Sequence, residues 1–140
     1  MPLFDAAVYA NEESTSEIKG HSVGNIVLSQ TYPIEEVQKA VCKAATRREW
    51  TVVESTSERV VIYLEHRKYE STLTFLLSDS NIKIYSDSYK IKKSKRKPIS
   101  TSSIDVRETE RIKQQDPKGW IDNLKKDIPI YLDGIHNGVD

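Results

Sequence analysis

The segment of residues 59–88 decides the fold of this chain and reads RVVIYLEHRKYESTLTFLLSDSNIKIYSDS. It contains three β-rich runs, at residues 60–64, 71–77 and 82–86, and each follows the previous one across a very short connection. Along each run, apolar residues recur at every second position and so lie on one face. A repeat of two residues is typical of a strand rather than of a helix. Polar connections such as residues 78–81 favour tight turns. The segment therefore predicts an antiparallel meander.

A helical pattern lies on each side of the meander. Residues 33–48 begin with Pro33 and repeat apolar residues at helical spacing. The second pattern begins at Asp116 and Pro117, because an Asp side chain accepts hydrogen bonds from free helical N–H groups and Pro suits the first turn. We expect Pro129 to kink or interrupt this second helix and to divide it into two shorter pieces.

Two further strands complete the predicted fold. One covers residues 24–32 before the first helix, and the other begins at Trp50 after it. The resulting order is β-α-β-β-β-β-α, which predicts an α+β fold in two layers, with an antiparallel sheet of about four to five strands packed by two helices. We expect Trp50 and Trp120 in the core, since each begins an element that faces the other layer.

The chain has the size of one domain. Its 140 residues with 37% hydrophobic content suit a single core. Residues 1–20 lack a sustained period and predict a flexible N-terminal arm, whereas residues 21–137 predict one α+β domain. Residues 90–115 predict a basic, Ser- and Lys-rich excursion from that domain, which could include an irregular hairpin extension.

Composition excludes several classes of function. Lys plus Arg and Asp plus Glu both number 21, so no whole-protein field attracts nucleic acid or anionic lipid, and any such role is local. No apolar run approaches the roughly 18 residues of a membrane-spanning helix, so we expect no integral membrane segment. Cys42 is the only cysteine, which excludes an intramolecular disulfide and a thiolate metal cluster within one chain.

The order of several short motifs resembles a known family. The motifs are Tyr32-Pro33 before a helix, Ala44-Ala45 in its last turns, Trp50-Thr51-Val52 at a strand start, Ile62 and Leu64 ahead of Arg67, Ile82-Lys83-Ile84-Tyr85-Ser86-Asp87-Ser88, and Trp120-Ile121-Asp122-Asn123-Leu124. This order is similar to that of small, mostly uncharacterised bacterial cell-envelope lipoproteins. The resemblance implies a lipidated N-terminus after export, a strand and helix, an antiparallel meander and a terminal helix. It implies no reaction.

The chain departs from the family pattern in two places. It has no lipobox cysteine near its N-terminus, and the connection from the last strand to the terminal helix is lengthened by the basic excursion. We therefore expect a periplasmic or envelope-associated protein where an export signal has been removed, and a cytoplasmic protein otherwise.

Candidate catalytic and metal-ligating residues are few. His21, His66 and His136 lie far apart without the spacing of a metal site, so we expect no metal and no cofactor. Cys42 on the first helix is better interpreted as a half-buried thiol than as a nucleophile.

Two serines invite comparison with a hydrolase. Ser86 and Ser88 flank Asp87, and His66 is expected on a neighbouring strand, but no nucleophile elbow surrounds either serine. We interpret these residues as polar strand-end positions, and we expect no enzymatic activity.

Two surfaces are candidates for binding. One is an aromatic face of the sheet, formed by Tyr63, Tyr69, Tyr85 and Tyr89, where a partner could bind instead of the rings only covering neighbouring strands. The other is a basic run on the excursion, which could hold phosphates or anionic head groups or be a solvated loop. The run consists of Lys90, Lys92, Lys93, Lys95, Arg96 and Lys97.

These surfaces support two hypotheses. The first is a non-enzymatic cell-envelope module, monomeric, that binds a protein or cell-wall component or has a structural role. The alternative is a protein that binds an anion, either nucleic acid or anionic lipid, through the basic run.

Overall fold

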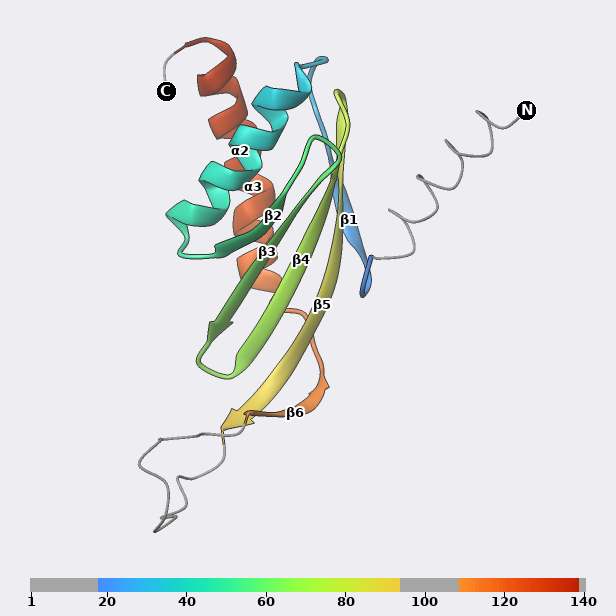
Figure 1. The fold of residues 1–140 in the computed structure, drawn as a ribbon, viewed down its shortest axis with the longest axis vertical. Helices are drawn as coiled ribbons and strands as arrows, with labels where there is room; N and C mark the ends of the chain where they lie inside the picture. The colour runs from blue at the N-terminus through green and yellow to red at the C-terminus, as the bar shows by residue number, and fades with distance from the viewer. Residues whose placement is uncertain (1–17, 94–108, 139–140) are drawn as a thin grey trace, which may run out of the picture.

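The computed structural model describes residues 18–93 and 109–138. Its elements in chain order are β1 (His21–Val27), α2 (Ile34–Arg47), β2 (Thr51–Ser55), β3 (Arg59–His66), β4 (Tyr69–Leu77), β5 (Asn81–Lys93), β6 (Thr109–Gln114) and α3 (Lys118–His136). Figure 1 shows an antiparallel sheet with both helices on one face, which confirms the predicted α+β fold in two layers.

The sheet has the order β1-β5-β4-β3-β2, and all pairs are antiparallel. β5 is long enough to hold two partners on one edge, because β1 pairs with its first half and β6 pairs with residues 89–93. The described sheet therefore has six strands, slightly more than the four to five predicted. The second half of β5 and the whole of β6 carry mostly polar residues on both faces. They therefore lack the alternation of apolar and polar residues that identifies a strand in a sequence.

The core lies between the sheet and the two helices. Apolar residues repeat along each helix at intervals of three and four, so they form one stripe that faces the strands. Trp50 is buried as predicted, and Trp120 is half-buried and packs against the core. The largest fully buried apolar side chains are Phe75, Ile62, Leu73, Ile82, Ile84, Leu124, Ile128, Leu132, Val37, Val41 and Val60.

α3 is one continuous helix, so the prediction of two shorter pieces is wrong. Pro129 lies inside it and removes a single N–H donor. Ile128 and Leu132, on the two sides of this proline, are both buried against the core. Burial of this apolar face holds the helix together across the missing hydrogen bond.

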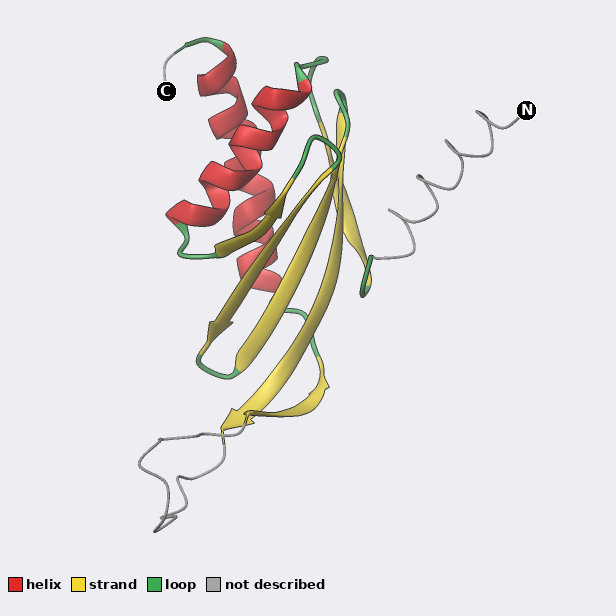
Figure 2. Cartoon of the chain, in the orientation of Figure 1, coloured by secondary structure: helices red, strands yellow, loops and turns green. Residues whose placement is uncertain are grey.

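The helices cover only part of the sheet. In Figures 1 and 2 the lower ends of β3, β4, β5 and β6 extend beyond α2, and α3 begins at this level. Residues 1–17, most of the predicted arm, and residues 94–108 of the predicted excursion lie outside the described residues. Within the described part of the chain, neither helix combines the length and the apolar composition needed to cross a membrane.

Candidate functional site: a basic and aromatic end of the sheet

Trp120, in the first turn of α3, is the centre of a cluster of rings. Its centroid lies 6.0 Å from that of Trp50 and 5.8 Å from that of Tyr69, both in edge-on geometry. The centroid of the His66 ring lies 6.1 Å from that of Trp120, with the two rings tilted by 50°. In the edge-on geometry the edge of one ring packs against the face of the other, so neither of the first two pairs is a face-to-face stack. Ring faces that remain accessible are where planar or cationic groups stack.

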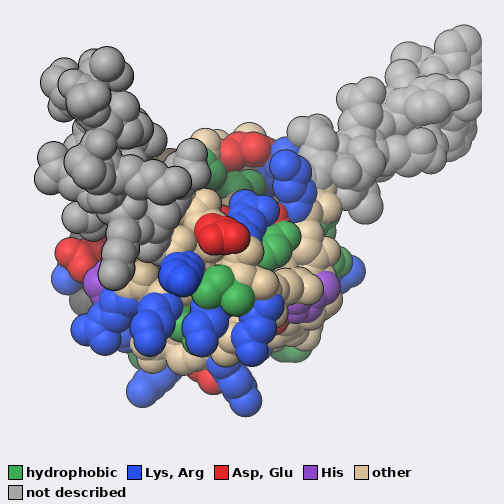
Figure 3. All heavy atoms as spheres, turned by 90° about the horizontal axis from the view of Figure 1, so that it is seen from below, with side chains coloured by type: hydrophobic (Ala, Val, Ile, Leu, Met, Phe, Trp, Pro, Cys, Tyr) green, Lys and Arg blue, Asp and Glu red, His purple; other side chains and the backbone are tan. Residues whose placement is uncertain are grey.

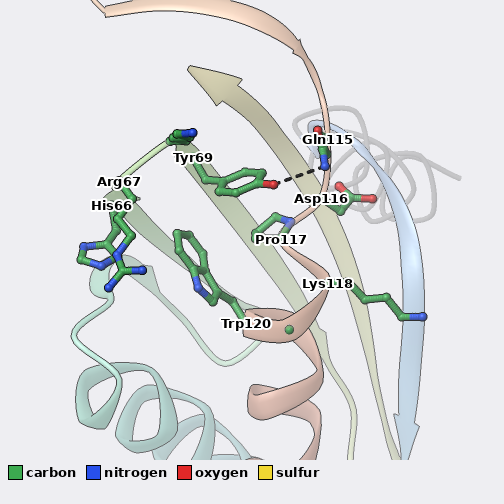
Figure 4. Close-up of a pocket in the computed structure, with 10 residues that line it drawn as sticks. His66, Arg67, Tyr69, Gln115, Asp116, Pro117, Lys118 and Trp120 are labelled. Carbon is green, nitrogen blue, oxygen red and sulfur yellow. Dashed lines mark hydrogen bonds between the residues drawn. The ribbon is translucent and has the colours of Figure 1, made fainter. Parts of the chain in front are cut away.

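An open cleft of about 820 Å³ lies over this cluster. It is bounded by the β3–β4 turn on one side and by residues 115–120 on the other. In Figure 4 the Trp120 ring lies between Tyr69 and the pair His66 and Arg67, whereas Lys118 extends toward β1. Trp120 and His66 also line a second cleft of about 280 Å³ toward Trp50. The volume of the larger cleft falls within the range of small-ligand sites.

A row of side chains crosses four strands beside the cleft. His66 pairs with Tyr69, Tyr69 with Lys90, and Lys90 with Lys113. Directly opposed residues of antiparallel strands point to the same face, so His66, Tyr69 and Lys90 share the face on which the helices lie. Lys113 is paired with Lys90 where the register of β5 and β6 shifts. The row therefore runs from aromatic groups at β3 and β4 to ammonium groups at β5 and β6.

Cations gather around the row. Figure 3, which views this end from below, shows Lys and Arg side chains crowding the surface. Arg111 of β6 pairs with Glu70 at 3.0 Å. The other cations of this end, which are Arg67, Lys68, Lys90, Lys113 and Lys118, have no side-chain hydrogen bond or ion pair to other described residues. We name this region the basic-aromatic end; it consists of His66, Arg67, Lys68, Tyr69, Lys90, Lys113, Lys118 and Trp120.

Arg67 adopts a backbone conformation that is unfavourable for its residue type. It is the first residue of the two-residue β3–β4 turn, and its φ is 56°. Gly is the usual residue where a tight hairpin requires positive φ. A bulky cation in this conformation costs stability, and such costs concentrate at functional sites.

The start of α3 lacks the side-chain cap predicted for Asp116. The helix begins after Pro117, and among the described residues no side chain caps its first turn. The Asp116 carboxylate instead accepts from Ser86 Oγ at 2.7 Å and lies 2.7 Å from His21 Nε2. The first-turn N–H groups, including that of Gly119 at the edge of the cleft, are thus left without acceptors among the described residues.

Asp116 belongs to a chain of polar groups beneath the cleft. The Ser71 and Ser88 hydroxyls lie 2.6 Å apart, and Ser88 Oγ lies 2.7 Å from Ser86 Oγ, which donates to Asp116. All three serines are fully buried, so these hydrogen bonds satisfy groups that water cannot reach. The chain fixes the segment that joins β6 to α3 against the sheet.

His21 extends this chain to the surface. The amide of Gln114 donates to its Nδ1 at 2.7 Å, so Nε2 carries the proton and donates to Asp116. His21 and Asp116 are 95 residues apart in sequence, and no spacing rule could have paired them. Sequence reasoning therefore missed this contact.

The serine arrangement is not that of a hydrolase. The Asp116 carboxylate lies between Ser86 and His21, whereas in a nucleophilic triad the histidine contacts the hydroxyl. Ser86 and Ser88 are also fully buried. His66, the residue that the hydrolase comparison required, is exposed at the end of β3 and contacts Trp120 instead.

The four predicted tyrosines do not share one face. The register places Tyr63, Tyr85 and Tyr89 on the face opposite the helices, and Tyr69 on the helix side next to Trp120. Tyr63 donates to Glu70 at 2.9 Å. Burial, and then this carboxylate, raises the pKa of Tyr63.

On the face of the sheet opposite the helices, which we name the open face, several side chains interact with one another. Arg111 lies 4.1 Å above the Tyr89 ring and also donates to Glu70 at 3.0 Å. A hydrogen bond to Asp87 raises the pKa of Tyr89. Tyr63 and Tyr89 are thus already engaged by Glu70, Arg111 and Asp87.

The predicted basic run is divided by the structure. Lys90 and Lys92 belong to β5, as does the backbone of Lys93. Lys95, Arg96 and Lys97 lie outside the described residues. Of the described residues of the run, Lys90 belongs to the row beside the cleft, and the register adds Lys113 to it, a cation that the sequence did not single out.

The remaining candidates are not brought together. His136 contacts Glu36 at 2.7 Å at the far end of α3, while Cys42 is half-buried beside the Ser55 hydroxyl at 3.4 Å. Among the described residues, no group of three or more His, Cys, Asp or Glu side chains is placed to hold a metal ion.

Comparison with protein-family models, with curated proteins and with solved structures finds no match for this chain. The resemblance to envelope lipoproteins therefore stays a prediction.

Proposed function

We propose that this protein is a non-enzymatic binding module that holds an anionic ligand at the basic-aromatic end. The observation that carries the proposal is the cleft itself, where cations without described partners border half-buried rings. The net charge of the chain is zero, so this end is a local concentration of positive charge rather than part of a basic protein.

The cost of this arrangement supports a ligand. Lys90 and Lys113 face each other across β5 and β6, and like charges in directly opposed positions destabilise a sheet. Arg67 adds the cost of its positive φ. An anion bound between these cations would remove the repulsion.

The polar groups nearby favour binding over catalysis. Ser86, the hydroxyl closest to a carboxylate and a histidine, is buried and already donates to Asp116. A nucleophile must reach its substrate and needs a base that accepts its proton. The arrangement of Asp116 and His21 instead fixes the floor of the cleft.

The predicted tyrosine face is a weaker candidate for the binding surface. Tyr63 and Tyr89 are engaged by Glu70, Arg111 and Asp87, so a partner would compete with existing interactions. The cleft, by contrast, contains cations that no described side chain neutralises.

The location that the family resemblance implies forms part of the proposal. We propose that the binding module acts in the bacterial cell envelope. Fractionation of the native host with an antibody against the protein tests this location, and recovery in the cytosol alone would contradict it.

The binding proposal is tested with polyphosphate, a polyanion without bases or lipid. We expect the protein to bind polyphosphate at 50 mM salt and more weakly at 200 mM salt, because the contacts are ionic. The triple variant Lys68→Ser, Lys90→Ser, Lys113→Ser should lose most of this binding.

A matched triple variant is the control. Lys39, Lys83 and Lys126 are exposed elsewhere on the molecule, and their replacement by Ser changes the net charge equally. Equal loss of binding in both triple variants would show a diffuse charge effect and would refute a site at the basic-aromatic end. Thermal unfolding of both variants confirms that they are folded.

A further inference from the structure

We propose that the anion is single-stranded nucleic acid, with a base stacked on Trp120 and the sugar-phosphate backbone following the row toward Lys113. This inference rests on the proposed function and names its ligand. It depends on two features that a purely ionic site would not need. These are the ring cluster around Trp120 and the row of side chains across β3, β4, β5 and β6.

The ring cluster offers a stacking surface. Trp120 is half-buried and lines both clefts, so part of its ring is accessible to a ligand. Aromatic side chains at the end of a positively charged groove are the usual binding platform for unpaired bases. The exposed His66 ring adds a second surface beside it.

The row of side chains defines a path for the sugar-phosphate backbone of the ligand. His66, Tyr69, Lys90 and Lys113 occupy one line across four neighbouring strands. Strands lie about 4.8 Å apart, so the row extends roughly 14 Å from β3 to β6. A chain whose base stacks at the β3 and β4 end passes its following phosphates over two ammonium groups.

Arg67, Lys68 and the uncapped start of α3 complete the phosphate contacts. Arg67 and Lys68 form the β3–β4 turn and line the cleft with Gly119. Guanidinium groups and free backbone N–H groups both bind phosphate oxygens. None of these groups reads a base edge, so we expect little sequence preference.

Other anions use this geometry less well. A duplex keeps its bases stacked inside, where Trp120 could not contact them. A bilayer surface is broad, whereas the rings lie in a recessed cleft. A polyanion without bases engages the cations and leaves the rings unused. Single-stranded nucleic acid alone among these uses both parts of the site.

The test compares four probes at 50 and 200 mM salt. They are an end-labelled 12-nucleotide thymidine oligonucleotide, its duplex with a complementary strand, polyphosphate, and phosphatidylglycerol vesicles. We expect the single strand to bind tightest and to quench tryptophan fluorescence. We also expect its logarithmic salt slope to become shallower by about 1.4 in the double variant Lys90→Ser, Lys113→Ser, since each lost phosphate contact removes about 0.7.

Ring variants separate stacking from charge. Trp120→Leu should weaken binding of the single strand roughly 5- to 150-fold, the usual effect of losing one stacked base, without changing the salt slope. Trp120→Phe keeps a ring and should lose less. Tyr85→Leu, on the opposite face of the sheet, is the control and should bind as the wild type does.

The outcomes distinguish the two proposals. Equal affinity for polyphosphate and the single strand, together with no effect of Trp120→Leu, would overturn the nucleic-acid inference and leave the anion site standing. Tighter binding to the duplex or to vesicles would do the same. Absence of salt-sensitive binding to all four probes would refute both proposals. If Trp120→Leu does not fold, the Trp120→Phe and Lys variants still decide the question.

Discussion

The helix-facing side of β4 and β5 has two halves with opposite chemistry. In the upper half, Leu73 and Phe75 lie beside Ile84, and all are fully buried beneath the helices. In the lower half the same alternating positions carry Ser71 and Ser88, and then the strands reach the basic-aromatic end. The strand period and the face do not change between the halves; only the residue types do.

The difference separates stability from binding. Apolar burial in the upper half supplies free energy of folding in proportion to the area removed from water. The lower half contributes less, because each buried hydroxyl must first recover the hydrogen bonds that it loses to water. The opposed cations Lys90 and Lys113, which have no side-chain partner among the described residues, lower stability further. We therefore expect substitutions in the two halves to affect stability and binding in opposite proportions.

The largest effect is expected in the upper half. Phe75→Ala should lower the free energy of unfolding by about 3–5 kcal/mol, because it removes a fully buried ring and leaves a cavity. Denaturant titration measures this loss, with the exposed Val53→Ala as the control. A loss of less than about 1 kcal/mol, the scale of an ordinary substitution, would contradict a packed upper half.

A substitution in the hydrogen-bonded chain of the three serines and Asp116 should lower stability by an intermediate amount. Asp116→Ala removes the acceptor of the buried Ser86 hydroxyl and should cost roughly 1–3 kcal/mol of stability. Asp122 is an exposed aspartate on α3, and Asp122→Ala is the matched control. Equal stability of the two variants would mean that the chain beneath the cleft is not important for folding.

A substitution in the β3–β4 turn should raise stability rather than lower it. Arg67→Gly relieves the positive φ and should raise the free energy of unfolding by about 1 kcal/mol. The same change removes a cation and should weaken binding of polyphosphate. Lys68→Gly serves as the comparison, since Lys68 lies in the same turn and is not among the residues with positive φ. A loss of stability in Arg67→Gly would contradict the interpretation of a strained functional residue.

A smaller increase in stability is expected from a substitution at the β6 end of the row. Lys113→Glu replaces repulsion of Lys90 by attraction across β5 and β6 and should stabilise the sheet by about 0.2–1 kcal/mol. Binding of polyphosphate should fall. Thermal unfolding at low and high salt measures the gain, which should shrink as salt screens the pair; a gain that is independent of salt would exclude this cause.

The open face should respond only at high pH. The pKa of Tyr63 is raised in the folded protein above 10.0, its ordinary value, so the folded state keeps the proton that the unfolded state releases. Stability from this group is therefore complete below pH 10.0 and is lost as pH rises above it. Between neutral pH and pH 11, the free energy of unfolding of Tyr63→Phe should fall less than that of the wild type. Parallel profiles of this free energy against pH would contradict a raised pKa of Tyr63.

Much of the fold could be predicted from the sequence because its apolar positions follow a clear period. Val60 and Ile62 alternate at the strand period, and Val37 and Val41 recur at the helix period, so each element shows which face it buries. In the second half of β5 and in β6 the sequence predicted only an excursion that could include an irregular hairpin, since both faces there are mostly polar. Pro129 suggested a break because local propensity does not include the burial that keeps α3 continuous.

The candidate site was only partly predictable. Lys90 and Tyr69 were each singled out, but for different surfaces, and only the register between β4 and β5 joins them. Asp116 was expected to cap α3, and its pairing with His21 depends on a contact between residues 95 positions apart. Such contacts follow from the three-dimensional arrangement of the strands, which a single sequence does not specify.

The most direct measurement is a titration of the isotope-labelled protein with the 12-nucleotide thymidine oligonucleotide, followed by two-dimensional NMR of its amide and indole N–H groups. We expect the largest shifts at the Trp120 indole, at the amides of Arg67 and Gly119, and at Lys113. Tyr85 on the open face should not shift. Shifts concentrated on the open face, or no shifts at all, would contradict a binding site at the basic-aromatic end.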